Sequence, residues 1–473
     1  MIGAYPVRDI RAAEMALMAR LPAGALMQRA AAALAARCAR LLGGPYGARV
    51  ALLVGAGDNG GDALYAGARL ARRGARVDAV LARPDRAHAQ GLAALRAAGG
   101  RVAGDPAQAV AGSDLVVDGL VGIGGSGGLR GEAVGLADLA REHGGLVVAV
   151  DLPSGVDADT GELPGAHVVA DVTVTFGARK IALVIDPAAA AAGRVEWIDI
   201  GLGTFLPKPS VEVLERSDVA TLRPDLGRDA DKYSRGVVGV LAGSAEYAGA
   251  AVLTVGGAIR GGAGMVRYLG TDDVARQVRH HWPESVTASG RVQAWVLGPG
   301  LGTDADRAQA MGTVLAAAEP AVVDAGGLRS LPAQLEVPAV LTPHAGELAR
   351  LLGVDRHDVE SRRLHHARTA ATRWKAVVLL KGSTTLVAAP DGRVRANPTG
   401  TPALATAGSG DVLAGLVGAL LAAGLDPFDA GSVAAYVHGA AGRLAAQTAA
   451  YPSATDVLDA LPSALAGTER IGG

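Results

Sequence analysis

Short apolar runs alternate with alanine-rich stretches along most of the chain. Between about residues 48 and 200, the apolar runs have the length and the valine and leucine content of buried strands, at residues 50–54, 76–82, 114–118, 146–151, 171–176 and 195–200. Alanine-rich stretches with helical spacing separate these runs. The alternation predicts an α/β fold built on a doubly wound parallel sheet.

The alternation stops between residues 201 and 231, where Pro207, Pro209, Pro224 and several charges leave no strand pattern. It then resumes, with expected strands at residues 236–242, 294–297, 321–324, 339–342, 376–380 and 385–388. A boundary is therefore expected near residues 203–212. Since 473 residues are too many for one ordinary core, we predict two α/β domains, residues 1–207 and 213–470.

Composition and charge argue against several classes of protein. The formal net charge is −1 and no basic tract carries interleaved aromatic residues, so no nucleic-acid partner is expected. No run of eighteen apolar residues is free of charges and of dense glycine, so no membrane association is expected. The single cysteine, Cys38, cannot form an intrachain disulfide, which favours the cytoplasm.

A glycine-rich turn follows the first expected strand of the N-terminal half. Residues 55–60 match G-x-G-x-x-G, and Asp78 lies near the place of a ribose-binding acid, as in a NAD-dependent dehydrogenase. However, Asp58 and Asp62 would bring carboxylates to a turn that faces a pyrophosphate, which electrostatics disfavours. Asn59 and these carboxylates suit a cation or sugar hydroxyls better.

Polar residues also follow three later strands of this half, namely Asp118, then Asp151 with Ser154, and Lys180. The carboxyl ends of parallel strands share one crevice, where ligands bind. Each aspartate taken singly could equally be a helix cap. Together they predict a ligand site at this edge of the sheet.

The segments 57–62, 117–122, 151–155 and 175–180 resemble the NAD(P)H-hydrate epimerase family, the N-terminal half of bifunctional bacterial repair enzymes. The resemblance covers nearly all of residues 1–205 and implies a Rossmann-like fold. It implies a potassium ion held by Asn59, Asp118 and Ser154, and proton handling by Asp151 and Lys180. It implies substrate contacts from the 58–62 loop, the 122–128 loop and Asp151, and we select Asp58, Asn59, Gly60, Gly61, Asp62, Gly122, Ile123, Gly124 and Asp151.

In the C-terminal half, residues 406–411 (Thr-Ala-Gly-Ser-Gly-Asp) directly precede a helical run at residues 412–421. Small residues let backbone N–H groups surround an anion at a helix start, and Asp411 is a candidate base there. An ordinary turn followed by an N-cap is the alternative. The paired histidines at 280–281 and 365–366 lack metal-site spacing and are expected on the surface.

Together with residues 232–250, 298–302, 341–347 and 380–385, this loop resembles the ADP-dependent NAD(P)H-hydrate dehydratase domain over about residues 215–470. The resemblance implies a ribokinase-like α/β/α fold that uses ADP and Mg²⁺, with Asp411 as catalytic base. It implies a hydrate site lined by Ala250, Gly302, His344 and Asp411. It implies an adenine-nucleotide site, seen as AMP after turnover, formed by Lys381, Gly382, Ser383, Thr384, Thr385 and Gly410.

The expected function is repair of hydrated NADH and NADPH. One domain would epimerise the R and S hydrates, and the other would dehydrate the S form with ADP, giving AMP and phosphate, in a cytoplasmic homo-oligomer. Three alternatives remain open on the residues. They are a ribokinase-like small-molecule kinase with an N-terminal binding module, a non-enzymatic N-terminal interaction module, and the dehydrogenase suggested by the glycine turn.

Overall fold

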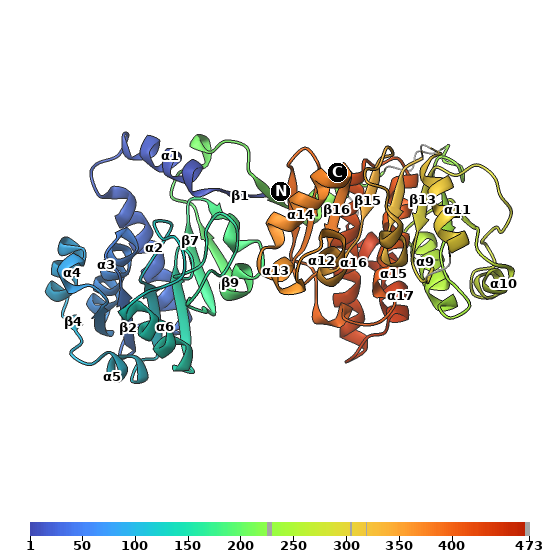
Figure 1. Cartoon of the computed structure of the whole chain (residues 1–473). Helices are drawn as coiled ribbons and strands as arrows, with labels where there is room; N and C mark the ends of the chain where they lie inside the picture. Colours follow the sequence, from blue (N-terminus) through green and yellow to red (C-terminus); the bar gives the residue numbers. More distant parts are fainter. Residues whose placement is uncertain (225–228, 303–304, 318, 469–473) are drawn as a thin grey trace. The chain divides into compact units, whose positions relative to one another are not determined.

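The computed structural model describes residues 1–224, 229–302, 305–317 and 319–468. Clustering of contacts divides it into two compact units. The N-terminal unit comprises Gly3–Val211, and the C-terminal unit combines Met1–Ile2 with Glu212–Gly473. Each unit is a sheet covered by helices (Figure 1). The α/β class predicted for both halves is therefore confirmed.

The N-terminal unit holds a parallel sheet in the order β4-β3-β2-β5-β6-β7-β9, beside a short parallel pair of β1 with β8. Its strands are β1 (Ile2–Tyr5), β2 (Arg49–Val54), β3 (Arg76–Leu81), β4 (Arg101–Val102), β5 (Leu115–Gly119), β6 (Leu146–Val150), β7 (Val172–Phe176), β8 (Arg179–Lys180) and β9 (Arg194–Ile198). Its helices are α1 (Val7–Met18), α2 (Ala25–Leu41), α3 (Asp58–Arg72), α4 (Ala89–Ala97), α5 (Pro106–Ala111), α6 (Glu132–Glu142) and α7 (Ala188–Ala191).

Alternating side chains of this sheet fill two cores. Leu52 of β2 packs with Leu34 of α2 and Leu64 of α3, whereas its neighbour Leu53 packs with Leu136 of α6. Successive strand residues point to opposite faces, so continuous valine and leucine runs bury both faces under helices. This doubly wound arrangement brings the carboxyl ends of β2, β5, β6 and β7 to one edge.

The C-terminal unit holds strands in the order β12-β11-β13-β14-β15-β16-β17-β18-β10, parallel except for the antiparallel run β16-β17-β18. The strands are β10 (Val211–Val213), β11 (Val237–Leu241), β12 (Met265–Tyr268), β13 (Ala294–Leu297), β14 (Ala321–Val323), β15 (Ala339–Leu341), β16 (Val377–Leu380), β17 (Thr385–Ala388) and β18 (Val394–Asn397). The helices are α8 (Arg216–Leu222), α9 (Ala248–Arg260), α10 (Asp272–His281), α11 (Ala305–Leu315), α12 (Ala345–Leu352), α13 (Arg356–Ser361), α14 (Arg363–Trp374), α15 (Ser409–Ala422), α16 (Pro427–Thr448) and α17 (Ala454–Ala466).

Helix α15 is central to this unit. It is apolar on nearly all sides, and it packs with α9, α16 and α17 over β-strand residues such as Val238 and Val296. Close packing of α15 on α9 requires glycine, because a Cβ on Gly415 would lie 2.1 Å from the Thr254 carbonyl oxygen. The helix is thereby fixed with its N-terminus at the carboxyl edge of the sheet.

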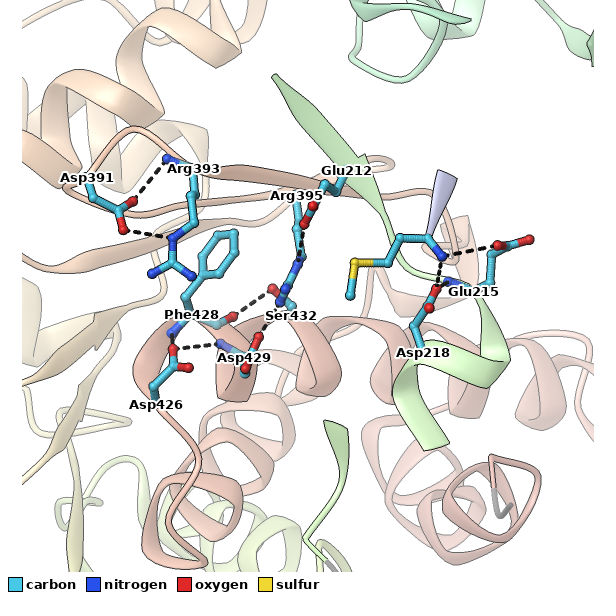
Figure 2. A network of polar contacts seen from close by, with 11 residues as sticks. Glu212, Glu215, Asp218, Asp391, Arg393, Arg395, Asp426, Phe428, Asp429 and Ser432 are labelled. Carbon is cyan, nitrogen blue, oxygen red and sulfur yellow. Dashed lines mark hydrogen bonds and ion pairs between the residues drawn. The ribbon is translucent and has the colours of Figure 1, made fainter. Parts of the chain in front are cut away.

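The expectation of no strand between residues 201 and 231 is wrong, because β10 and α8 lie there. Strand β10 has only three residues, too few for a readable alternation. Charged side chains attach it to the C-terminal unit. Figure 2 shows Arg395 of β18 between Glu212 of β10, at 3.2 Å, and Asp429 of α16, at 2.5 Å. Arg395 also lies over the Phe428 ring, 4.4 Å from its centre. Such pairings over long sequence separations have no local pattern.

Strands β12 and β18 were also not predicted, and both mix polar with apolar residues. Among the described residues, no helix combines the length and the apolar character needed to cross a membrane.

Candidate active sites

The turn after β2 brings two backbone segments very close together. A Cβ on Gly55 would lie 1.7 Å from the Leu120 carbonyl oxygen, and one on Gly60 would lie 2.3 Å from the Gly55 carbonyl oxygen. Glycine is therefore required at both positions. Helix α3 begins at Asp58, so residues 58–62 form its first turn and not a loop as expected.

Asp118, at the end of β5, has no exposed surface and is bound by neutral donors. It accepts hydrogen bonds from Ser154 Oγ at 2.6 Å, Ser154 N at 2.8 Å and Leu120 N at 3.2 Å. Among the described residues, no lysine, arginine or histidine forms an ion pair with Asp118. Burial raises its pKa to about 6 in spite of these hydrogen bonds. A carboxylate in this position would be stabilised by a bound cation.

The side chains of Ser154 and Asn59 bring two further oxygen atoms to the segment that follows Asp118. Ser154 Oγ lies 3.1 Å from the Val121 carbonyl oxygen and accepts a hydrogen bond from Val121 N at 2.8 Å. Asn59 Oδ1 faces the backbone of Gly122, where a Cβ would lie only 3.0 Å from it. The expected ligands Asn59, Asp118 and Ser154 thus gather around the segment that follows β5.

Asp151, directly after β6, forms an ion pair with Lys180, which is 1% exposed. The Lys180 ammonium also donates to Thr175 Oγ1 at 3.1 Å, and Thr175 Oγ1 lies 3.3 Å from Asp151 Oδ1. Asp151 has a backbone φ of 70°, which is uncommon for a residue other than glycine. Strained backbone of this kind concentrates at functional sites. Asp151 and Lys180 are therefore held together as one pair, with Lys180 buried and Asp151 partly buried.

Carboxylates crowd this pair. Burial, together with the charges of Asp151, Asp58 and Glu14, raises the pKa of Asp62 well above its usual range. Glu14 comes from α1, and burial also raises its pKa. The sequence analysis missed Glu14, because α1 precedes the recognisable motifs and its approach to the sheet edge is a tertiary contact.

The 122–128 segment follows β5 and passes near α1. Arg11 of α1 donates a hydrogen bond to the Ile123 carbonyl oxygen at 3.3 Å. Gly122 and Ile123 are half-buried and Gly124 is exposed, so these three positions face an accessible edge.

Asp78 does not lie at the sheet edge as a ribose-binding acid would. It sits in β3 opposite Ala51, and Arg76 and Arg101 each contact it at 3.1 Å. Because its charge is already paired within the sheet, the dehydrogenase interpretation of the glycine turn loses its acidic partner.

In the C-terminal unit, residues 298–302 follow β13 in a tight turn. A Cβ on Gly298 would lie 2.0 Å from the Asp324 carbonyl oxygen, and one on Gly300 would lie 2.6 Å from Ala250 Cβ. Gly302 is exposed and lies near Ser244, whose Oγ would be 3.9 Å from a Cβ there. The expected hydrate-site residues Ala250 and Gly302 therefore border the same turn.

Lys381 and Asp411 meet at the carboxyl edge of this sheet. Lys381 Nζ lies 2.9 Å from Asp324 Oδ1 and would lie 3.3 Å from a Cβ on Gly410, the residue before Asp411. Burial, with the Asp324 carboxylate, raises the pKa of Asp411 to about 7. Burial opposes the charged form of Lys381, but Asp324 and Glu347 outweigh it and raise the Lys381 pKa. Lys381 is thus a paired cation and not a solvated one.

No catalytic or binding role was predicted from the sequence for Asp324 or Glu347. Asp324 is 1% exposed at the end of β14, and Glu347 Oε2 lies 3.9 Å from Lys381 Nζ. The expected hydrate ligand His344 is the N-cap of α12, where its Nδ1 accepts hydrogen bonds from Gly346 N and Glu347 N. Its other ring nitrogen, Nε2, lies 3.6 Å from Glu347 Oε1. The His344 side chain is half exposed, so capping leaves it accessible.

Residues 381–385, which are expected to bind the nucleotide, form a turn. Arg363, the first residue of α14, stabilises this turn through hydrogen bonds. Arg363 Nη2 donates to the carbonyl oxygens of Leu380 at 3.2 Å, Lys381 at 3.2 Å and Thr384 at 3.1 Å. A Cβ on Gly382 would lie 2.4 Å from this nitrogen, so the turn closes around the guanidinium. Gly382 and Ser383 are exposed, whereas Thr384 and Thr385 are buried.

At the start of α15, Ser409 turns into the protein. Its Oγ and carbonyl oxygen lie 3.2 and 3.0 Å from His438 Nε2, and burial lowers the pKa of His438 to about 4. Gly410 and Asp411, the next two residues of α15, are half-buried.

The surface position expected for His366 is wrong, because that side chain is buried and contacts Asp358 at 2.8 Å.

Comparison with known proteins finds relatives that cover most of the chain. It matches the NAD(P)H-hydrate dehydratase family over residues 238–463 and the YjeF-related protein N-terminus family over residues 23–182. It is 48% identical over 468 residues to the bifunctional NAD(P)H-hydrate repair enzyme Nnr of Mycobacterium leprae, which covers 96% of this chain and 95% of that protein. The Nnr protein of Mycobacterium tuberculosis (strain ATCC 25618 / H37Rv) is 49% identical over 436 residues, 89% of each chain.

Solved structures resemble the C-terminal unit. The ADP/ATP-dependent NAD(P)H-hydrate dehydratase from Bacillus subtilis, co-crystallised with ATP/Mg²⁺, is 32% identical, with a TM-score of 0.52, over 55% of this chain and 99% of that one. A ribokinase-like superfamily protein from Enterococcus faecalis is similar in fold, with a TM-score of 0.51 and 24% identity over 56% of this chain and 98% of that one. The ribokinase-like fold predicted for this half is confirmed.

Proposed function

The chain belongs to the family of bifunctional NAD(P)H-hydrate repair enzymes, and from that premise we propose how its two units share the reaction. The enzyme epimerises the R and S hydrates of NADH and NADPH and dehydrates the S hydrate with ADP. We assign epimerisation to the N-terminal unit and dehydration to the C-terminal unit. The observation that carries this division is that each sheet has its own set of buried ionisable groups at its carboxyl edge.

In the N-terminal unit, Asp151 and Lys180 are the proton-handling pair. The ion pair leaves little freedom for either side chain, so both are oriented before substrate arrives. The first turn of α3, from Asp58 to Asp62, and residues 122–124 border the same edge of the sheet. They contact the hydrated nucleotide in this proposal.

We propose that Asn59, Asp118 and Ser154 hold a potassium ion. The support is the chemistry of the donor set, since amide, carboxylate, hydroxyl and carbonyl oxygens are hard ligands suited to such a cation. Asp118 in particular is a fully buried carboxylate with only neutral donors around it. When bound, the ion supplies the positive charge that Asp118 lacks and fixes the segment after β5.

In the C-terminal unit, Asp411 is the base. A hydroxyl on the nicotinamide ring is a poor leaving group, and transfer of the terminal phosphoryl group of ADP onto its oxygen converts it into a good one. Asp411 accepts the hydroxyl proton and AMP departs. The carbon–oxygen bond to the phosphate then breaks, a proton leaves the neighbouring ring carbon, and the new carbon–carbon double bond restores the dihydronicotinamide. Ala250, Gly302 and His344 line the hydrate site in this proposal, with Asp411 at its edge.

The adenine nucleotide lies on the turn formed by Lys381, Gly382, Ser383, Thr384 and Thr385, with Gly410 at the start of α15. Lys381 and the N-terminus of α15 supply positive potential for its phosphates. We propose that Mg²⁺ accompanies the nucleotide. The carboxylates of Asp324, Glu347 and Asp411 all act on Lys381, an excess of negative charge that suits a cation held by carboxylates and phosphates together. When bound there, Mg²⁺ would neutralise phosphate charge during transfer.

We further propose a cytoplasmic homo-oligomer. The single cysteine, Cys38, is buried and free, in keeping with a reducing compartment.

The kinase alternative is not favoured, because neither the epimerase motifs of the N-terminal unit nor the relatives that cover most of the chain support it.

The test supplies each purified hydrate epimer of NADH separately. With ADP and Mg²⁺, the S epimer should give NADH, AMP and phosphate in equal amounts, and without ADP it should only epimerise. A phosphorylated alcohol that accumulates, with no NADH formed, would contradict the proposed function. The same assays on NADPH hydrate determine which coenzyme is preferred.

A further inference from the structure

Two buried polar atoms in the first turn of α3 have no hydrogen-bond partner in the described residues. They are Asp62 Oδ1 and Asn59 Nδ2, and the Asn59 side chain is only 8% exposed. Buried polar atoms are almost always paired. Residues three apart lie on one face of a helix, so both side chains project from the same face of α3. The helix therefore offers two unused polar groups beside the Asp151–Lys180 pair.

Asp62 differs from Asp151 in the charges that act on it. Three carboxylates, Glu14 of α1, Asp58 of α3 and Asp151 after β6, act on it electrostatically, against the ammonium of Lys180 from β8. Lys180 already forms an ion pair with Asp151. Burial and the three carboxylates raise the pKa of Asp62 well above its usual range. The Asp62 carboxyl is thus biased toward its protonated form, while the neighbouring Asp151 carboxyl is ion-paired, the arrangement that separates an acid from a base.

We infer that Asp62 is a second catalytic residue of the epimerase, the general acid that protonates the departing hydroxyl while the Asp151–Lys180 pair accepts a proton on the opposite face. The inference rests on the proposed function of the N-terminal unit. Inversion at one carbon through a planar intermediate is catalysed well by a group on each face, because one group protonates the departing hydroxyl and the other accepts the proton of the water that adds from the opposite side.

The step balances without a further reactant. The proton of Asp62 moves to the hydroxyl oxygen, the carbon–oxygen bond breaks, and the lone pair of the neighbouring ring nitrogen forms a carbon–nitrogen double bond as water leaves. A second water adds from the other face, and the electron pair returns to nitrogen. Its proton passes to Asp151. Asp62 is then ionised and Asp151 protonated, which is the state that catalyses the opposite inversion.

The first test is Asp62→Asn in the full chain, compared with Asp62→Glu and with Asp85→Asn, an exposed carboxylate in the same unit. We expect Asp62→Asn to lower the epimerase kcat by about a hundredfold or more, with KM within about threefold. Asp62→Glu should recover part of the rate, and Asp85→Asn should match the wild type. Dehydration of pure S hydrate by the same protein reports that the chain is folded.

The wild type should also lose epimerase kcat/KM at high pH, as Asp62 ionises, and Asp62→Asn should lose that limb. A rise in KM with kcat unchanged would overturn the inference and leave Asp62 as a binding residue.

The second test needs no variant. In H₂¹⁸O the wild type should place one labelled oxygen in each epimerised molecule, and inversion without label would overturn the inference. If the wild type does not epimerise at all, the proposed function fails instead.

Discussion

The two sheet edges hold buried charge in different ways. At the N-terminal edge, Asp118 is fully buried among neutral donors, and Asp62 and Glu14 crowd a single ammonium, Lys180. At the C-terminal edge, the buried Asp324 is paired directly with Lys381, which also feels Glu347 and Asp411. Both edges are rich in carboxylates, but only the second places its lysine on the turn assigned to the nucleotide.

This difference suggests how each site meets its ligand. A carboxylate without a charged partner is costly to bury, so the N-terminal edge gains most from a bound cation. At the C-terminal edge, Lys381 lies beside the N-terminus of α15. The ammonium and the helix N-terminus both attract phosphate. Substitutions that remove one charge at a time should therefore affect one activity and spare the other.

The largest effect is expected for Asp411→Asn. Because the base can no longer accept the hydroxyl proton, the dehydration rate should fall by about a thousandfold, while epimerisation stays within about twofold of wild type. The measurement is NADH formation from S hydrate with ADP. Asp391→Asn, at the exposed turn between β17 and β18, is the matched control. Equal loss of both activities in Asp411→Asn would contradict the separation of the two sites.

Asp151→Ala should produce the opposite pattern. Without the ion-paired carboxylate, the epimerisation rate should fall by about a hundredfold, and ADP-dependent dehydration of S hydrate should continue. Chromatographic separation of the two epimers over time measures this directly. A variant that epimerises at the wild-type rate would show that Asp151 has no catalytic role.

Asp118→Asn tests whether the buried Asp118 carboxylate, which has only neutral hydrogen-bond donors around it, binds a cation. The potassium concentration that gives half-maximal epimerase activity should rise by about tenfold, since the substitution removes the only carboxylate in the proposed ligand set. Titration with KCl at constant ionic strength, set with a large organic cation, measures the shift. Potassium independence of the wild type would remove the proposed ion.

The pH dependence of dehydration should report Asp411. Its pKa is raised to about 7, and a base works only when ionised, so kcat/KM should fall as the pH drops through this value. At pH 6 the rate should be about tenfold below its plateau. Epimerisation measured in the same buffers is the internal comparison. A flat dehydratase profile between pH 6 and 8 would exclude this assignment.

The smallest effect is expected for Arg363→Lys. Lysine keeps the charge but loses the guanidinium geometry that holds the turn of Lys381 and Thr384 through their carbonyl oxygens. The KM for ADP should rise by about fivefold with little change in kcat. Initial rates over a range of ADP concentrations separate the two parameters, and an unchanged KM would show that the turn is stable without Arg363.

Sequence predicted the parts of this molecule that have a local pattern. Buried parallel strands such as β2 and β13 are continuous apolar runs, and glycine turns mark their carboxyl ends. The pairing of Asp324 with Lys381 joins residues 57 positions apart, and only the fold reveals it. The same holds for the hydrogen bonds of Arg363 to the turn at residues 381–385 and for the interaction of Glu14 with Asp62. Partners brought together by tertiary contacts leave no trace in spacing or periodicity.

The most direct measurement is absorbance in the reduced-nicotinamide band when the protein is added to a mixture of R and S NADH hydrate, with ADP and Mg²⁺ present and then omitted. The account predicts full recovery of absorbance that depends on ADP and outpaces spontaneous epimerisation. Recovery that stops at the S fraction would contradict the epimerase assignment, and no recovery would contradict the repair function.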